Sequence, residues 1–204
     1  MKKLFFDLGA HHGESLDYFS KKLPDPKNFD VICVEASPLN YEKLVSKKSF
    51  YDNIFNDIKM INACVENSAN HIIDFHECVS EAGSEGSTTS RYKAYSFIHP
   101  DPKKQLKKTY KTVRINTYDI VQSYLKALNI YNDIIIKMDI EGSEYSVLPD
   151  LIKVLSPEHT KQIYGEFHNI KVNVSKTEDE KLINLLEKRG IKFYNLCSLP
   201  KNEY

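Results

Sequence analysis

Short apolar runs alternate along the chain with longer stretches in which apolar residues recur every three or four positions. Runs of the first kind predict strands, and the periodicity of the second kind predicts helices. The run Ile134-Ile135-Ile136 is typical of a strand that is buried on both faces. We expect strands near Lys3–Leu8, Asp30–Glu35, Lys59–Val65, His71–Glu77, Thr112–Asn116, Asp133–Asp139, Gln162–Phe167 and Lys192–Cys197. We expect helices near Glu14–Lys22, Asn40–Lys48, Tyr118–Leu128, Ser143–Val154 and Glu178–Arg189.

The alternation of strand and helix predicts an α/β fold with a mostly parallel central sheet and helices on both faces. A chain of 204 residues has the length of one domain, so we expect a single domain over residues 1–204. A long insert at about 79–110 interrupts the alternation of strands and helices. It has no clean periodicity and contains glycines, prolines, lysines and the run Ser87–Ser90. A loop of this length is either a solvated excursion or a substrate-side loop or lid.

Charge and cysteine content narrow the class of partner. The chain has 28 basic and 28 acidic side chains, so no global field favours nucleic acid or an acidic membrane surface. Its four cysteines show no metal-type spacing, which suits reduced thiols in the cytoplasm. No stretch approaches the roughly 18 apolar residues of a membrane span. We therefore expect a cytoplasmic protein with neither a nucleic-acid nor a membrane partner, and the composition would permit a homo-oligomer.

The end of the first predicted strand carries the most informative motif. The apolar run Leu4-Phe5-Phe6 leads into Asp7-x-Gly9-x-x-x-Gly13, which places a carboxylate and bare backbone at the carboxyl edge of the sheet. The second strand ends in Glu35, where an acidic residue can bind the two hydroxyls of a ribose. The two features predict a nucleoside cofactor. The pattern is not GxGxxG, and a carboxylate would repel a diphosphate, which favours S-adenosylmethionine over NAD.

Two later strands end in further groups able to carry chemistry. Asp139 and Glu141 follow one buried strand, and Glu166 and His168 follow the next. We expect these acids at the same sheet edge as Asp7, with Glu166 and His168 on one side of their strand. Either of these two could act as a general base. The four groups could instead hold a Mg²⁺ or Mn²⁺ ion.

Five stretches of the chain, taken in order, resemble the FkbM-type methyltransferases: FFDLGAHHGES, VICVEASP, INACV, IIIKMDIEGSEYSVL and YGEFH. The resemblance extends from about Leu4 to His168, and its most specific parts are KMDIEGSE and VEASP. It implies a class I methyltransferase with a Rossmann-like fold that depends on S-adenosylmethionine.

The resemblance also implies roles for individual residues. Those of the first loop would surround the methionine part of the cofactor: Asp7, Gly9, Ala10 and Gly13, with His11 standing where the family often has Asn. Those after the second and third strands would bind the nucleoside: Glu35 at the ribose, and Ala36, Ser37, Asn62 and Ala63 around the adenine. Asp139 and Glu141 would stand near the methyl donor and the acceptor.

Our hypothesis is transfer of the sulfonium methyl to a hydroxyl of a sugar or another small polar metabolite. His168 or Asp139 would remove the hydroxyl proton, and Glu166 would orient the imidazole or bind the acceptor. Bound metal would make a protein base less necessary. Two alternatives from other classes are a non-catalytic subunit that binds S-adenosylmethionine or a nucleoside, and a nicotinamide-dependent oxidoreductase. A nucleic-acid methyltransferase is disfavoured by the neutral charge and by the lack of an NPPY- or DPPY-type motif.

Overall fold

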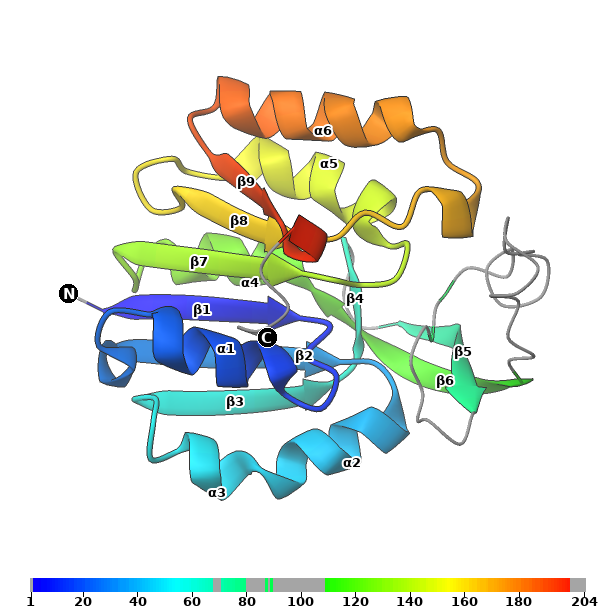
Figure 1. The fold of residues 1–204 in the computed structure, drawn as a ribbon, viewed down its shortest axis with the longest axis horizontal. Coiled ribbons are helices and arrows are strands. Elements are labelled where there is room, and N and C mark those ends of the chain that lie inside the picture. The colour runs from blue at the N-terminus through cyan, green and yellow to red at the C-terminus, as the bar shows by residue number, and fades with distance from the viewer. Residues whose placement is uncertain (1, 68–70, 80–86, 88, 90–108, 199–204) are drawn as a thin grey trace.

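A computed structural model of the chain describes residues 2–67, 71–79, 87, 89 and 109–198. Its central feature is a six-stranded sheet in the order β3-β2-β1-β7-β8-β9 (Figure 1). Its strands are β1 (Lys3–Leu8), β2 (Phe29–Glu35), β3 (Asp57–Asn62), β7 (Asp133–Met138), β8 (Gln162–Gly165) and β9 (Lys192–Asn195). Neighbouring strands of this sheet pair in parallel. The predicted α/β, Rossmann-like fold is therefore confirmed.

Helices cover both faces of the sheet (Figure 1). They are α1 (Glu14–Lys22), α2 (Pro38–Ser46), α3 (Lys48–Tyr51), α4 (Ile120–Ala127), α5 (Glu144–Val154) and α6 (Lys176–Lys188). Side chains of α1, α2 and α3 pack with Phe5 on one face, and those of α4, α5 and α6 pack with Leu4 and Phe6 on the other. This division follows from the alternation of side chains along a strand, and it explains why β1 is apolar at consecutive positions.

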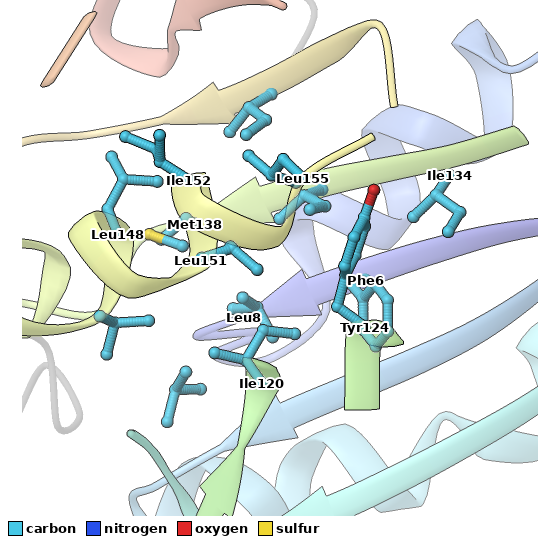
Figure 2. Packing of buried hydrophobic residues seen from close by; sticks show 14 of the residues in the cluster. Phe6, Leu8, Ile120, Tyr124, Ile134, Met138, Leu148, Leu151, Ile152 and Leu155 are labelled. Carbon is cyan, nitrogen blue, oxygen red and sulfur yellow. The ribbon is translucent and has the colours of Figure 1, made fainter. Parts of the chain in front are cut away.

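The larger core lies between the sheet and the helices α4 and α5. In Figure 2, Phe6 and Leu8 of β1 and Ile134 and Met138 of β7 lie beside side chains of these two helices. The labelled helix residues are Ile120, Tyr124, Leu148, Leu151, Ile152 and, just beyond the end of α5, Leu155. The packing fixes the carboxyl ends of β1 and β7 side by side, and this is where the chain forms its cavity.

A second, three-stranded sheet has the order β4-β6-β5. Its strands are β4 (Cys64–Glu66), β5 (Ile72–Val79) and β6 (Thr109–Asp119), with β5 antiparallel to β6. The prediction of one strand over Lys59–Val65 was wrong, because the chain leaves the large sheet at Ala63 and Cys64 starts a strand in the small one. Of the predicted insert at 79–110, residues 80–86, 88 and 90–108 lie outside the described residues.

The other differences concern element ends. The predicted strand Gln162–Phe167 ends at Gly165, so Glu166 and His168 lie in the segment after it. The helix predicted from Asn40 begins at Pro38, where Ser37 is the N-cap and its side chain accepts a hydrogen bond from the Asn40 N–H. Within the described residues, no helix combines the length and hydrophobicity that a membrane crossing requires.

Candidate active site

A cavity of about 470 Å³ opens at the carboxyl ends of β1, β2 and β7. It lies where the strand order reverses, since β1 has β2 on one side and β7 on the other. Open α/β sheets bind their ligands at this point, and the volume suits a small organic ligand. The described lining includes six of the predicted site residues that end or follow β1, β2 and β3, namely Gly9, Ala10, His11, Glu35, Ala36 and Ala63. It also includes three predicted acids that follow β7 and β8, namely Asp139, Glu141 and Glu166.

The turn after β1 requires glycine at two places. Gly9 has φ of 79°, and a Cβ atom there would lie 1.9 Å from the carbonyl oxygen of Asp139. Gly13 has φ of 92°, and its Cβ would lie 2.5 Å from the Tyr51 hydroxyl. The backbone of Gly9 and Ala10 donates to the Val34 carbonyl at 2.9 and 3.1 Å. The bare backbone therefore lets the β1 turn approach the end of β7 closely, as the glycine spacing suggests.

Asp7 is fully buried and does not belong to the described lining of the cavity. Its Oδ2 accepts a hydrogen bond of 2.5 Å from the Ser15 hydroxyl, and its Oδ1 lies 3.3 Å from Lys137 Nζ. The Lys137 ammonium also donates to the Gly9 carbonyl. Asp7 thus neutralises a buried lysine and anchors the glycine turn. A direct contact between Asp7 and the cofactor stays a prediction.

Glu35 lies at the cavity wall with only 7% of its surface exposed. Its Oε2 accepts from the His11 N–H at 2.9 Å, and its Oε1 accepts from the Ser37 N–H at 2.8 Å. Burial raises the pKa of Glu35, and these two backbone donors oppose the shift. A carboxylate has about four acceptor positions, so two remain for the hydroxyls of a ribose. The remaining acceptor positions of Glu35 therefore fit the ribose hydroxyls of the predicted cofactor.

Residues around Glu35 hold its backbone in place. Asn62 donates from its side chain to the Glu35 and Ala36 carbonyls at 2.9 and 3.1 Å, and Ser37 donates from its hydroxyl to Glu77 Oε1 at 2.7 Å. Gly13, Ser37 and Asn62 are not among the described lining residues. Their cofactor contacts remain predictions. Cys64, Phe75, Ser87 and Thr89 line the same cavity, although the sequence analysis assigned none of these four residues to the site individually.

Two adjacent histidines form the rim of the turn. His11 has φ of 49°, and its ring stacks on that of His12 with centroids 3.8 Å apart. His11 Nδ1 lies 3.1 Å from both carboxylate oxygens of Glu14. Burial acts to raise the pKa of Glu14, but the hydrogen bond to His11 and further donors hold it down at about 2. Burial and the neighbouring His11 lower the pKa of His12, whose Nε2 lies 2.8 Å from Asn40 Oδ1.

Opposite Glu35, carboxylates surround the buried imidazole of His168. Its Nε2 lies 3.3 Å from Glu141 Oε2, 3.6 Å from Glu166 Oε1 and 3.7 Å from Asp139 Oδ1. The sequence analysis placed these four residues at one sheet edge, and the structure brings them together. The carboxylates line the cavity, whereas the His168 side chain is 2% exposed and lies behind them. An acceptor in the cavity would meet Asp139 or Glu166 before the imidazole.

Glu144, to which the sequence analysis assigned no role, is the partner of His168. Its Oε1 lies 3.1 Å from His168 Nδ1, and the carboxylate accepts from the N–H groups of Ile140 and Gly142 at 2.9 and 2.8 Å. Lys137 was likewise missed as a partner of Asp7. Its position inside an apolar strand, where a lysine requires an anionic neighbour, was the available signal.

Comparison with known protein families agrees with this geometry. The model of the methyltransferase FkbM domain matches residues 7–193, which is nearly the whole chain. Comparisons with curated proteins and with solved structures gave no match. The matched region contains the glycine turn, Glu35 and the carboxylates around His168. This chain therefore belongs to the FkbM methyltransferase family.

Proposed function

We propose that the protein uses S-adenosylmethionine to methylate a hydroxyl group of a sugar or another small polar metabolite. The observation that carries the proposal is the arrangement of the cavity lining: Glu35 ends β2 on one side of β1, and Asp139, Glu141 and Glu166 follow β7 and β8 on the other side. The first side suits a ribose, and the second suits a polar acceptor that must lose a proton. Family membership gives methyl transfer, while the cofactor and the acceptor class are our inference.

The cofactor end of the site is preorganised. Two backbone N–H groups hold the Glu35 carboxylate toward the cavity, and the glycine turn presents backbone without side chains beside it. When bound, S-adenosylmethionine supplies an electrophilic methyl group that is already activated. The protein then has to align the acceptor oxygen with that methyl group and exclude competing nucleophiles.

At the acceptor end the chain must take up the hydroxyl proton. Asp139 and Glu166 line the cavity and lie within 4 Å of His168 Nε2. One of these carboxylates would accept the proton, and the buried imidazole would keep both in position. The proposal thus keeps Asp139 as a candidate base, adds Glu166 as the other candidate, and changes His168 from a predicted base to a residue that positions the carboxylates.

Calorimetric titration with S-adenosylmethionine and S-adenosylhomocysteine tests the cofactor. We expect micromolar binding, about −8 kcal/mol, that is lost in Glu35→Ala. Glu42→Ala, an exposed acid on the neighbouring helix α2, is the matched control and should bind as the parent chain does. Failure of the folded parent chain to bind either compound would refute the proposal.

A non-catalytic binding subunit is the remaining alternative. It would bind the cofactor but release no S-adenosylhomocysteine with any sugar-like acceptor. The presence of Asp139, Glu141 and Glu166 in one cavity favours catalysis. We also propose that the protein works in the cytoplasm, because all four cysteines are free thiols and three of them are buried.

A further inference from the structure

The surroundings of His168 determine which ring nitrogen carries hydrogen. Nδ1 lies 3.1 Å from Glu144 Oε1, and a glutamate carboxylate offers only acceptors. Nδ1 therefore donates to Glu144. The other ring nitrogen, Nε2, is aimed at Asp139, Glu141 and Glu166, which lie 3.7, 3.3 and 3.6 Å away. Three carboxylates gathered around one buried nitrogen repel one another, and a cation held among them would offset their charge.

From this geometry we infer that Asp139, Glu141 and His168 Nε2 bind a divalent cation of the Mg²⁺ or Mn²⁺ class. One ligand atom from each residue lies within 4.8 Å of the others. The two carboxylates suit a hard cation such as Mg²⁺ or Mn²⁺, and the imidazole, a ligand typical of transition metals, favours Mn²⁺ over Mg²⁺. Glu144 would act as the outer partner of His168, as carboxylates commonly do for metal-bound histidines.

The spacing of the atoms supports an ion more than direct ion pairs. Charge-assisted hydrogen bonds between nitrogen and a carboxylate are about 2.7–2.9 Å long, whereas Nε2 lies 3.3 Å from Glu141 and 3.7 Å from Asp139. Ligand atoms about 2.1 Å from one ion, at right-angled or tetrahedral positions, lie about 3.0–3.4 Å apart. The distance to Glu141 already falls in that range. The distance to Asp139 would need only a small side-chain rotation.

The site also has an entrance. The side chains of Asp139 and Glu141 are 33% and 25% exposed and line the cavity, whereas that of His168 is 2% exposed. An ion held there would face the cavity with positions left for water or an acceptor oxygen. It would lower the pKa of a bound hydroxyl, and Glu166 would remain as the proton acceptor. This consequence rests on the proposed function, but the ion site itself does not.

A second group, His11, His12 and Glu14, also brings three ligand atoms together. It suits an ion less well, because His12 Nε2 lies 2.8 Å from Asn40 and the Glu14 side chain is 47% exposed. Variants of this second group nevertheless serve as controls, because they change the same kinds of ligand at a different place and so test where the ion binds.

Titration of the full chain with MnCl₂, without S-adenosylmethionine, tests the inference by calorimetry and by the electron paramagnetic resonance signal of free Mn²⁺. We expect one site whose affinity falls at least tenfold in Glu141→Gln. Glu144→Gln should lose about 10- to 100-fold, as is typical when the outer partner of a metal-bound histidine is changed. His12→Gln should bind Mn²⁺ as the parent chain does. Circular dichroism and thermal unfolding confirm that each variant is folded.

The inference is overturned if the folded parent chain binds no Mn²⁺ at millimolar concentration. Loss of binding in His12→Gln but not in Glu141→Gln would place the ion at the other group and would also overturn it. A chain that binds Mn²⁺ but no S-adenosylmethionine would refute the proposed function and leave the ion site standing.

Discussion

Lys137 Nζ lies 3.3 Å from Asp7 Oδ1, and the two side chains are 4% and 0% exposed. Asp7 of β1 and Lys137 of β7 are register partners near the carboxyl ends of neighbouring strands, and they form a buried ion pair. The pair also fixes the glycine turn, because Lys137 donates to the Gly9 carbonyl. The conformation of the cofactor end of the cavity therefore depends on a contact between strands far apart in sequence.

Replacement of Lys137 should destabilise the fold strongly. Lys137→Met leaves the Asp7 carboxylate buried without its cation, and such a change costs about 3–5 kcal/mol. The double variant Asp7→Asn, Lys137→Met should recover much of this loss, since no charge remains buried. Lys3→Met is the control, because Lys3 pairs with Asp133 at 3.5 Å on the surface, where such pairs contribute about 0–1 kcal/mol. Urea unfolding measures the free energies. Equal losses for Lys137→Met and Lys3→Met would contradict the prediction.

A comparison of Gly9→Ala with Gly190→Ala distinguishes the destabilisation caused by backbone strain from that caused by a steric clash. Both glycines have φ near 80°, where an L-residue costs roughly 1–2 kcal/mol. At Gly190 no described residue lies within 4 Å of an added Cβ, so strain alone is expected there. At Gly9 the Cβ would collide with the Asp139 carbonyl, so we expect a larger loss of stability and loss of S-adenosylmethionine binding. Thermal unfolding and calorimetry of the two variants compare the effects, and similar behaviour of both would refute the close approach.

The sequence predicts the sheet well because its strands are continuous apolar runs that end at acids and glycines. The sequence does not reveal that the chain passes from the large sheet to the small one at Ala63. The residues on both sides of Ala63 favour strands, and no local sequence signal marks the change of sheet. Pairing with β6 decides where β4 goes, and that partner lies more than 40 residues further along the chain.

The same distinction between local sequence signals and contacts with distant residues applies to the candidate site. The positions of Glu35, Asp139 and Glu166 at strand ends could be predicted, because parallel strands end at a common edge. The direction of each side chain could not. Asp7 turns toward Lys137, and Glu144 turns back from the first turn of α5 toward His168. Both orientations depend on partners that only the folded chain brings near.

Asp139→Asn should reduce methyl transfer by about 10²- to 10⁴-fold, the range typical of general acid–base catalysis, whether Asp139 takes up the proton itself or holds the ion beside Glu166. An amide keeps the shape of the side chain but removes its negative charge beside His168. Asp133→Asn is the control, since Asp133 begins the same strand β7 at its opposite end and forms a surface pair with Lys3. Release of S-adenosylhomocysteine in the presence of an acceptor measures turnover. Full turnover by a folded Asp139→Asn variant would remove Asp139 from the catalytic group.

Ionised Glu14 should stabilise the folded protein, and this stabilisation should disappear in acid. The pKa of Glu14 in the folded chain is about 2, below its ordinary value of 4.5, so folding favours the ionised form. The stabilisation is complete above about pH 4.5 and is lost as the pH falls toward 2. We therefore expect the parent chain to be more stable than Glu14→Gln at pH 5–6, by an amount that shrinks below pH 4.5. The side chain is about half exposed, so solvent screening keeps the difference small. Denaturant unfolding of both chains at a series of pH values measures it, and a difference that grows on acidification would show that Glu14 is not held ionised by His11.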